Sequence, residues 1–280
     1  MVTFPKAKIN IGLRITGKRD DGFHDIETLF YPLPLCDALE FVASDNNQKS
    51  DILNVTGIAT ACRPEDNLVI KAVSILRESY EFPFLNIHLH KAIPTGAGLG
   101  GGSSDAAYIL RGINRWFGLN LDCDKLRSIA LKLGSDSPFF IEATPAFGLG
   151  RGEILVPCGR DIFSNNYMIL LNPGIHVNTG DAYKNCTPAS PEHNLSELFD
   201  NLPVEKWRNR IVNDFEDYVI GRHPLIGILK EELYRSGALF SLMSGSGSSV
   251  YGIFKNKTPV PKNLKEYLVW QGFLQPGQVR

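Results

Sequence analysis

The fold of this chain is decided by residues 94–107, which read Pro-Thr-Gly-Ala-Gly-Leu-Gly-Gly-Gly-Ser-Ser-Asp-Ala-Ala. The glycines lack the Cβ atoms that prevent a backbone from closing around an anion, and they adopt positive φ angles without steric cost. Apolar residues then recur at the period of a helix. They are Ala106, Ile109, Leu110, Ile113 and Phe117. A glycine loop that leads into a helix directs free N–H groups and the positive end of the helix dipole to one point, which indicates a phosphate site.

Better-known glycine motifs fit this stretch less well. Gly96-x-Gly98-x-x-Gly101 matches the dinucleotide-binding fingerprint, but that fold requires an acidic residue about 20 positions later at the end of a second strand. Asp122 and Asp124 stand instead between two helical patterns. A P-loop needs Lys and then Ser or Thr after its last glycine, and a protein-kinase loop needs a Val-Ala-Ile-Lys strand downstream. A flexible glycine linker does not usually run from a strand into an amphipathic helix.

The length and composition of the chain limit the kinds of protein that it can be. A chain of 280 residues accommodates two packed domains, and we expect the boundary near residue 156. The net charge of −1 gives no general attraction to nucleic acid or anionic membranes, so any phosphate binding is local. The five cysteines have no spacing typical of zinc sites or disulfide frameworks. With no targeting segment and no apolar run of membrane-spanning length, a reduced cytoplasmic compartment is expected.

Several polar residues have an ordinary structural interpretation. Lys8 and Asn10 alternate with the apolar residues of a strand over 7–15, and a solvated polar face would explain them. Asp136 could belong only to a turn or a helix cap. Asn67 is placed to cap a helix that begins at Leu68.

Two further patterns lie on either side of the glycine loop. The strand pattern over 85–90 carries His88 and His90 on one face, where surface histidines are more probable than a metal pair because no cross-strand ligand is evident. A second helical pattern runs over 126–133, and Gly134 is predicted to close it.

The stretch 94–107 resembles the phosphate-binding motif of the GHMP small-molecule kinase superfamily, which includes galactokinase, homoserine kinase and mevalonate kinase. The resemblance implies an α+β, two-domain GHMP kinase fold. Residues 1–155 would form a ribosomal-protein-S5-like N-terminal domain that binds ATP, and residues 156–280 a ferredoxin-like C-terminal domain that completes the substrate cleft. The extended run 98–107 is similar to one branch, whose members use ATP and Mg²⁺ to phosphorylate the 2-hydroxyl of a cytidine-diphosphate-linked methylerythritol in the non-mevalonate isoprenoid pathway.

The resemblance also implies the reacting residues. Residues 5–10 are similar to the opening motif of the branch, which places Lys8 at the catalytic centre and Asn10 on the substrate. Residues 134–138 match the segment whose carboxylate, here Asp136, faces the acceptor hydroxyl and would take its proton. The residues implied in ATP binding are Asn67, Lys91, Pro94, Gly96, Gly98, Leu99, Gly100, Gly101, Gly102, Ser103 and Ser104.

Aromatic residues are implied in binding the acceptor. Phe23 and His24 stand where the branch has the Tyr-His pair that holds the cytosine ring, and Phe23 keeps the stacking face of tyrosine while losing its hydroxyl. Thr179 and Tyr183 occupy substrate positions, with Tyr183 as the second face of a cytosine sandwich. The glycine-serine run over 244–249 corresponds to a loop that steadies the phosphate loop.

Two other functions stay open from the sequence. The first is a GHMP-type alcohol kinase with a smaller acceptor, against which the extended glycine run and the Phe23-His24 pair argue. The second is a nucleotide-binding sensor without catalysis, against which Lys8 and Asp136 argue. The sequence implies no nucleic acid, membrane or protein partner. We also expect a branched side chain at Gly101 to occupy the space where backbone amides meet phosphate.

Overall fold

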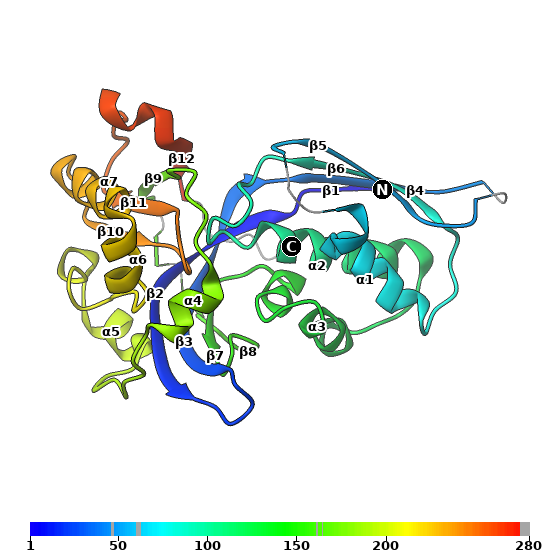
Figure 1. Ribbon diagram of the computed structural model, residues 1–280, viewed down its shortest axis with the longest axis horizontal. Coiled ribbons are helices and arrows are strands. Elements are labelled where there is room, and N and C mark those ends of the chain that lie inside the picture. Colours follow the sequence, from blue (N-terminus) through cyan, green and yellow to red (C-terminus); the bar gives the residue numbers. More distant parts are fainter. Residues whose placement is uncertain (46–47, 60–62, 161, 164, 275–280) are drawn as a thin grey trace. The chain divides into compact units, whose positions relative to one another are not determined.

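The computed structural model describes residues 1–45, 48–59, 63–160, 162–163 and 165–274 (Figure 1). The chain forms two compact units that interleave along the sequence. The first unit comprises residues 1–8, 33–95 and 100–143, and the second comprises residues 9–32, 96–99 and 144 onward. This division differs from the linear one expected from the sequence, because residues 9–32 belong with the C-terminal half. Cys62 lies outside the described residues.

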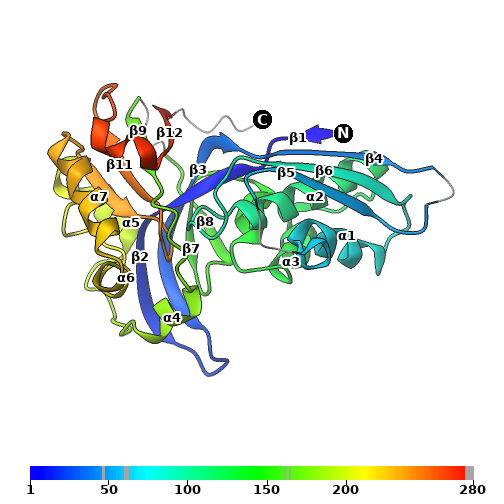
Figure 2. The ribbon, with the colours of Figure 1, turned by 45° about the horizontal axis from the view of Figure 1, so that its top comes forward.

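The first unit is a mixed sheet covered by helices on one face (Figures 1 and 2). Its strands, in spatial order, are β1 (Val2–Thr3), β4 (Ala38–Ala43), β6 (Leu85–Lys91) and β5 (Ile52–Gly57). Its helices are α1 (Leu68–Arg77), α2 (Gly101–Phe117) and α3 (Cys123–Leu131), with 3-10 turns η1 (Pro64–Asp66) and η2 (Ser137–Ile141). Strand β6 runs antiparallel to β4 and parallel to β5, and it leads directly into the glycine loop.

Local sequence accounts for the helix ends of the first unit. Asn67 caps α1 as predicted, because its Oδ1 accepts a hydrogen bond from the backbone N–H of Val69 at 2.9 Å. Gly118 ends α2 in the left-handed conformation. The prediction that Gly134 closes α3 is wrong. That helix ends at Leu131, since the next two residues form tighter bonds, from Lys132 N to Ile129 O and from Leu133 N to Ala130 O.

The second unit contains two sheets. The first has β2 (Lys6–Lys18), β3 (His24–Cys36), β7 (Ala146–Leu149) and β8 (Ile154–Pro157). The first residues of β2 and the last residues of β3 belong to the first unit. The second has β10 (Phe240–Met243), β11 (Val250–Phe254), β9 (Tyr167–Leu171) and β12 (Leu268–Phe273). The helices are α4 (Thr179–Lys184), α5 (Leu195–Asn201), α6 (Glu216–Arg222) and α7 (Pro224–Arg235), with 3-10 turns η3 (Val204–Lys206) and η4 (Lys262–Tyr267).

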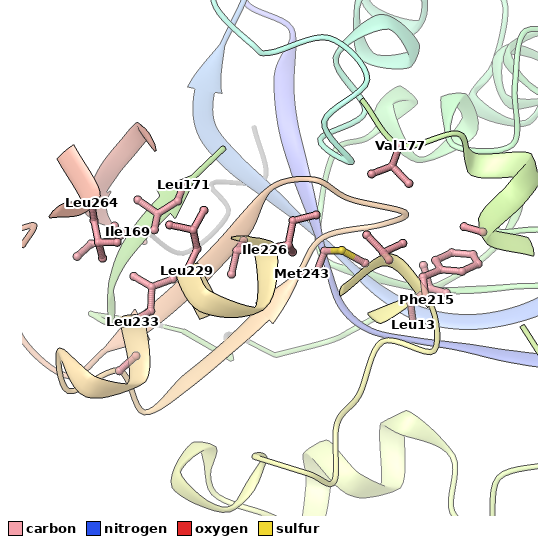
Figure 3. Packing of buried hydrophobic residues seen from close by; sticks show 14 of the residues in the cluster. Leu13, Ile169, Leu171, Val177, Phe215, Ile226, Leu229, Leu233, Met243 and Leu264 are labelled. Carbon is pink, nitrogen blue, oxygen red and sulfur yellow. The ribbon is translucent and has the colours of Figure 1, made fainter. Parts of the chain in front are cut away.

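An apolar core joins these elements of the second unit. Side chains of β2, β9, α6, α7 and β10 pack together, and Figure 3 labels Leu13, Ile169, Leu171, Val177, Phe215, Ile226, Leu229, Leu233, Met243 and Leu264 among them. Strand β9 is buried at every residue, and it is an inner strand of its sheet, paired with β11 on one side and β12 on the other. Within the described chain, no helix combines the length and the apolar character needed to cross a lipid bilayer.

Candidate active site

The phosphate loop has the backbone geometry that its glycines predict. Gly96, Gly98 and Gly100 have φ angles of +65°, +76° and +70°, a region that other residues rarely adopt. Gly100 is the N-cap residue of α2, and no side chain in the described structure caps that helix. The first N–H groups of α2 are therefore left to bind an external acceptor, which is the arrangement of a phosphate site.

A second loop supports the phosphate loop, as expected. Residues 244–249 connect β10 to β11, and the Ser244 hydroxyl donates a hydrogen bond to the Gly98 carbonyl at 2.8 Å. The backbone N–H of Ser249 donates to the carbonyl of Ala97 at 3.2 Å. A Cβ atom on Gly98 would lie only 2.0 Å from the Ser244 carbonyl oxygen. Glycine at this position is therefore required both by its φ angle and by the close approach of the two loops.

Lys8 and Asp136 form the central pair of the site. Lys8 Nζ lies 3.2 Å from Asp136 Oδ2, and their side chains are 4% and 35% exposed. The solvated-face interpretation of Lys8 is wrong, because both faces of β2 are covered at this residue. Asp136 starts η2 but its side chain makes no capping bond. The accessible carboxylate is thus held beside a buried cation, and the Lys8 side chain also packs against the start of α2 at Gly100.

Lys91 lies in a buried cluster of three ionisable side chains, with Asp37 and Asp105. Its ammonium group donates to Asp37 and, at 2.7 Å, to Asp105 Oδ2, and the side chains of all three residues are 4% exposed or less. Burial raises the pKa of Asp105 to about 8, although the positive charge of Lys91 opposes this shift. Burial also acts to lower the pKa of Lys91, but the charges of Asp105 and Asp37 outweigh it and raise that pKa. Sequence reasoning missed both acids. The sequence did offer one signal that Lys91 is buried, because the alternation of β6 puts this residue on the buried face of the strand.

The other residues implied in ATP binding differ in how far they are exposed. Gly102 is exposed and Ser103 is half-buried, whereas Leu99 and Ser104 are buried. The Ser104 hydroxyl has no hydrogen-bond partner among the described residues, so a bound oxygen could supply one. Pro94 is half-buried at the start of the loop, and Asn67 is occupied in part by capping α1.

The expectation for Gly101 is wrong. A Cβ atom there would meet Ile93 Cγ2 at 3.0 Å and Lys91 Nζ at 3.3 Å. These atoms belong to the interior of the first unit, so a side chain at Gly101 would disturb packing before it reached a bound phosphate. At Gly102, by contrast, the nearest atom to an added Cβ is Leu68 Cδ1 at 3.6 Å, an ordinary contact.

Asn10 is fully enclosed within the second unit. Its Nδ2 donates to Thr28 Oγ1 at 2.9 Å, and its backbone N–H donates to the Ser244 hydroxyl at 3.2 Å. The Tyr251 hydroxyl donates to the Asn10 carbonyl at 3.0 Å. Asn10 therefore connects β2 to the loop that supports the phosphate loop, whatever contact it also makes with a substrate.

The aromatic residues implied in acceptor binding pair differently from the expected sandwich of Phe23 and Tyr183. His24 stacks on Tyr183, with ring centroids 5.0 Å apart and planes inclined by 21°. Phe23 is 50% exposed, and the guanidinium group of Arg151 lies 4.6 Å above its ring. Thr179 Oγ1 lies 2.7 Å from Ser246 Oγ, which joins α4 to the loop over 244–249. Sequence reasoning did not identify Arg151.

The described residues contain no group of three or more His, Cys, Asp or Glu side chains that could hold a metal ion. His88 and His90 both lie within hydrogen-bond distance of Thr56 Oγ1, at 2.9 and 3.0 Å.

The fold and the glycine loop define a kinase of the GHMP class. A family model described as "GHMP kinases N terminal domain" matches residues 67–143, and one described as "GHMP kinases C terminal" matches residues 190–267. The first covers β6, the loop, α2, α3 and Asp136. The expected α+β fold of two domains is thereby confirmed.

Comparison with individual proteins identifies the family within the GHMP kinases. The chain is 48% identical over 276 residues to the 4-diphosphocytidyl-2-C-methyl-D-erythritol kinase of Parabacteroides distasonis, covering 98% of this chain and 100% of the relative. It is 42% identical to the Porphyromonas gingivalis kinase of the same name, with the same coverage. A crystal structure of 4-(cytidine 5'-diphospho)-2C-methyl-D-erythritol kinase matches 99% of this chain and 100% of its own, with a TM-score of 0.79 and 29% identity. The chain therefore belongs to the 4-diphosphocytidyl-2-C-methyl-D-erythritol kinase family.

Proposed function

We propose that the protein is an ATP-dependent kinase that phosphorylates the 2-hydroxyl of 4-diphosphocytidyl-2-C-methyl-D-erythritol, in the cytoplasm, within the methylerythritol phosphate route to isoprenoids. Relatives of that name share 48% and 42% of its residues over nearly the whole chain. The structural observation that carries the proposal is the contact of 3.2 Å between Lys8 and the accessible carboxylate of Asp136. A protein that only sensed nucleotides would have no need of this pair.

Phosphoryl transfer requires mainly positioning and the stabilisation of charge. The loop amides and the hydroxyls of Ser103 and Ser104 are the groups that would hold the phosphates of ATP. Mg²⁺ bound with the nucleotide would neutralise charge on the β and γ oxygens. Asp136 would accept the proton of the attacking hydroxyl as a general base. The ammonium group of Lys8, which is shielded from water, would stabilise the negative charge that develops on the attacking oxygen.

Recognition of the cytidine part is assigned to residues of the second unit. The exposed ring of Phe23 offers a stacking surface, while His24 and Tyr183 provide a second aromatic group that is already assembled. Thr179 lies in the first turn of α4, beside the loop over 244–249. These contacts would hold the acceptor by a part remote from the reacting hydroxyl, which helps to orient that hydroxyl.

The test compares acceptors under one set of conditions. Purified protein is incubated with ATP, Mg²⁺ and either the cytidine-linked acceptor, the tetrol phosphate without cytidine, homoserine or mevalonate, and ADP release is followed. We expect turnover with the cytidine-linked acceptor and almost none with the others. Asp136→Asn serves as the control for contaminating kinases. Turnover with a small alcohol alone would identify a different alcohol kinase, and nucleotide binding without turnover would identify a sensor.

A further inference from the structure

The buried cluster of Lys91, Asp37 and Asp105 is built around the two ends of the phosphate loop. Asp37 lies between β3 and β4, Lys91 is the last residue of β6, and Asp105 lies just after the first turn of α2, as its fifth residue. The Lys91 ammonium group donates to both carboxylates. The side-chain atoms of one cluster therefore connect three elements that are distant in sequence.

Asp37 also fixes the backbone immediately before the loop. Its Oδ1 accepts hydrogen bonds from the N–H of Ala92 at 2.6 Å and from the N–H of Ile93 at 2.8 Å. These two residues are the link between β6 and Pro94. Hydrogen bonds to a charged carboxylate are stronger than bonds between neutral groups, so the entry to the loop is held firmly.

The exit from the loop is held by the same cation. Asp105 Oδ2 receives a hydrogen bond of 2.7 Å from Lys91, and a Cβ atom on Gly101, the first residue of α2, would lie 3.3 Å from Lys91 Nζ. The first turn of α2 therefore rests directly on the Lys91 side chain. The N–H groups of this turn are the ones that the proposed function assigns to phosphate.

We propose that Lys91, Asp37 and Asp105 are positioning residues, which hold the two ends of the phosphate loop at the separation that binds nucleotide phosphates, and that Lys91 acts through this cluster rather than as a nucleotide ligand. The proposal rests on the proposed function only in taking the loop as the nucleotide site. Burying ionisable groups is costly even when they are paired and hydrogen-bonded, so stability alone is a weak explanation for placing this cluster at the two ends of the loop.

The two roles of Lys91 predict opposite effects of removing an acid. If Lys91 bound the nucleotide, Asp37→Asn would release its ammonium group and strengthen binding. If Lys91 is a positioning residue, Asp37→Asn loosens the loop entry, and the affinity for ADP and for a non-hydrolysable ATP analogue with Mg²⁺ falls by about tenfold, the effect of losing one charge-assisted hydrogen bond. Asp105→Asn keeps an acceptor for Lys91 and should change affinity less than threefold or so, whereas Asp105→Leu should weaken it as Asp37→Asn does.

The chain offers a matched control at the other end of β6. Asp51 Oδ1 accepts a hydrogen bond from the N–H of Leu85 at 2.8 Å, and its carboxylate pairs with Arg77 at 2.7 Å. Asp51→Asn therefore removes the same kind of anchor from the same strand, far along the sequence from the loop. We expect it to lower the melting temperature while leaving nucleotide affinity unchanged.

The measurement is calorimetric titration of nucleotide into each folded variant, followed by steady-state kinetics. In Asp37→Asn the KM for ATP should rise while the KM for the acceptor stays constant, a split that general destabilisation would not produce. Tighter nucleotide binding by Asp37→Asn, or equal weakening by Asp51→Asn, would overturn the proposal. If Asp37→Asn does not fold, the comparison of Asp105→Leu with Asp105→Asn decides in the same way. Failure of the unmodified protein to bind nucleotide would instead reject the proposed function.

Discussion

Replacing Gly98 with alanine should destabilise the protein through a contact between two loops. At a φ angle of +76° a residue with a Cβ atom pays roughly 1–2 kcal/mol. The new Cβ would lie 2.0 Å from the Ser244 carbonyl oxygen, where ordinary contact begins at 3.4 Å, so one loop must move by more than 1 Å. Overpacking of this kind costs about 1–3 kcal/mol. Together these penalties lower the free energy of unfolding by about 2–5 kcal/mol and the melting temperature by roughly 4–15 °C.

The assay is thermal unfolding followed by circular dichroism, with the urea midpoint as a second measurement. Gly102→Ala is the matched control, because its Cβ would meet only Leu68 Cδ1 at 3.6 Å and the residue is helical. That change should leave stability unaltered or raise it by up to about 1 kcal/mol, since alanine is the better helix former. A melting temperature for Gly98→Ala within 1 °C or so of the unmodified protein would refute the reasoning.

Three other outcomes are expected. Asp136→Asn should lower kcat by about 10²–10⁴-fold while calorimetric affinities for nucleotide and acceptor stay nearly constant, and near-normal turnover would remove Asp136 from the chemistry. Burial raises the pKa of Asp105 from 3.8 to about 8, so the folded state keeps a proton that the unfolded chain releases. The urea midpoint should therefore fall as pH rises between about 4 and 8, and Asp105→Asn should flatten this slope. Phe23→Ala should reduce kcat/KM for the cytidine-linked acceptor by about one to two orders of magnitude, and Phe23→Tyr should change it little. Equal losses in both Phe23 variants would argue against stacking.

Much of the fold follows from local patterns. The alternation over 85–91 predicts β6, the cap at Asn67 predicts the start of α1, and the glycines predict the left-handed residues of the loop. Each of these depends on a few neighbouring residues. The Gly134 prediction failed for a local reason too, because a tight final turn ends α3 before the glycine is reached.

The parts that could not be predicted depend on contacts between distant residues. Lys8 is buried because a second layer covers its face of β2, and alternation alone cannot show whether such a layer exists. Asp37 stands 54 positions before Lys91, and no periodicity connects them. What a side chain added at Gly101 would contact depends on where Ile93 and Lys91 lie once β6 and α2 have packed. Motif resemblance supplied the candidate residues, but it did not reveal which ones are enclosed.

The interleaving of the two units affects how the chain folds as it is synthesised. The first unit needs nothing beyond residue 143, so it can form when about half of the chain has left the ribosome. Residues 9–32 emerge early, yet apart from residues 96–99 the rest of the second unit begins only at residue 144. At typical elongation rates the apolar strand around Ile9 and Ile11 waits on the order of ten seconds or more before that unit is complete. A nascent chain stalled after residue 143, before the second unit is complete, should therefore be the form most prone to aggregate.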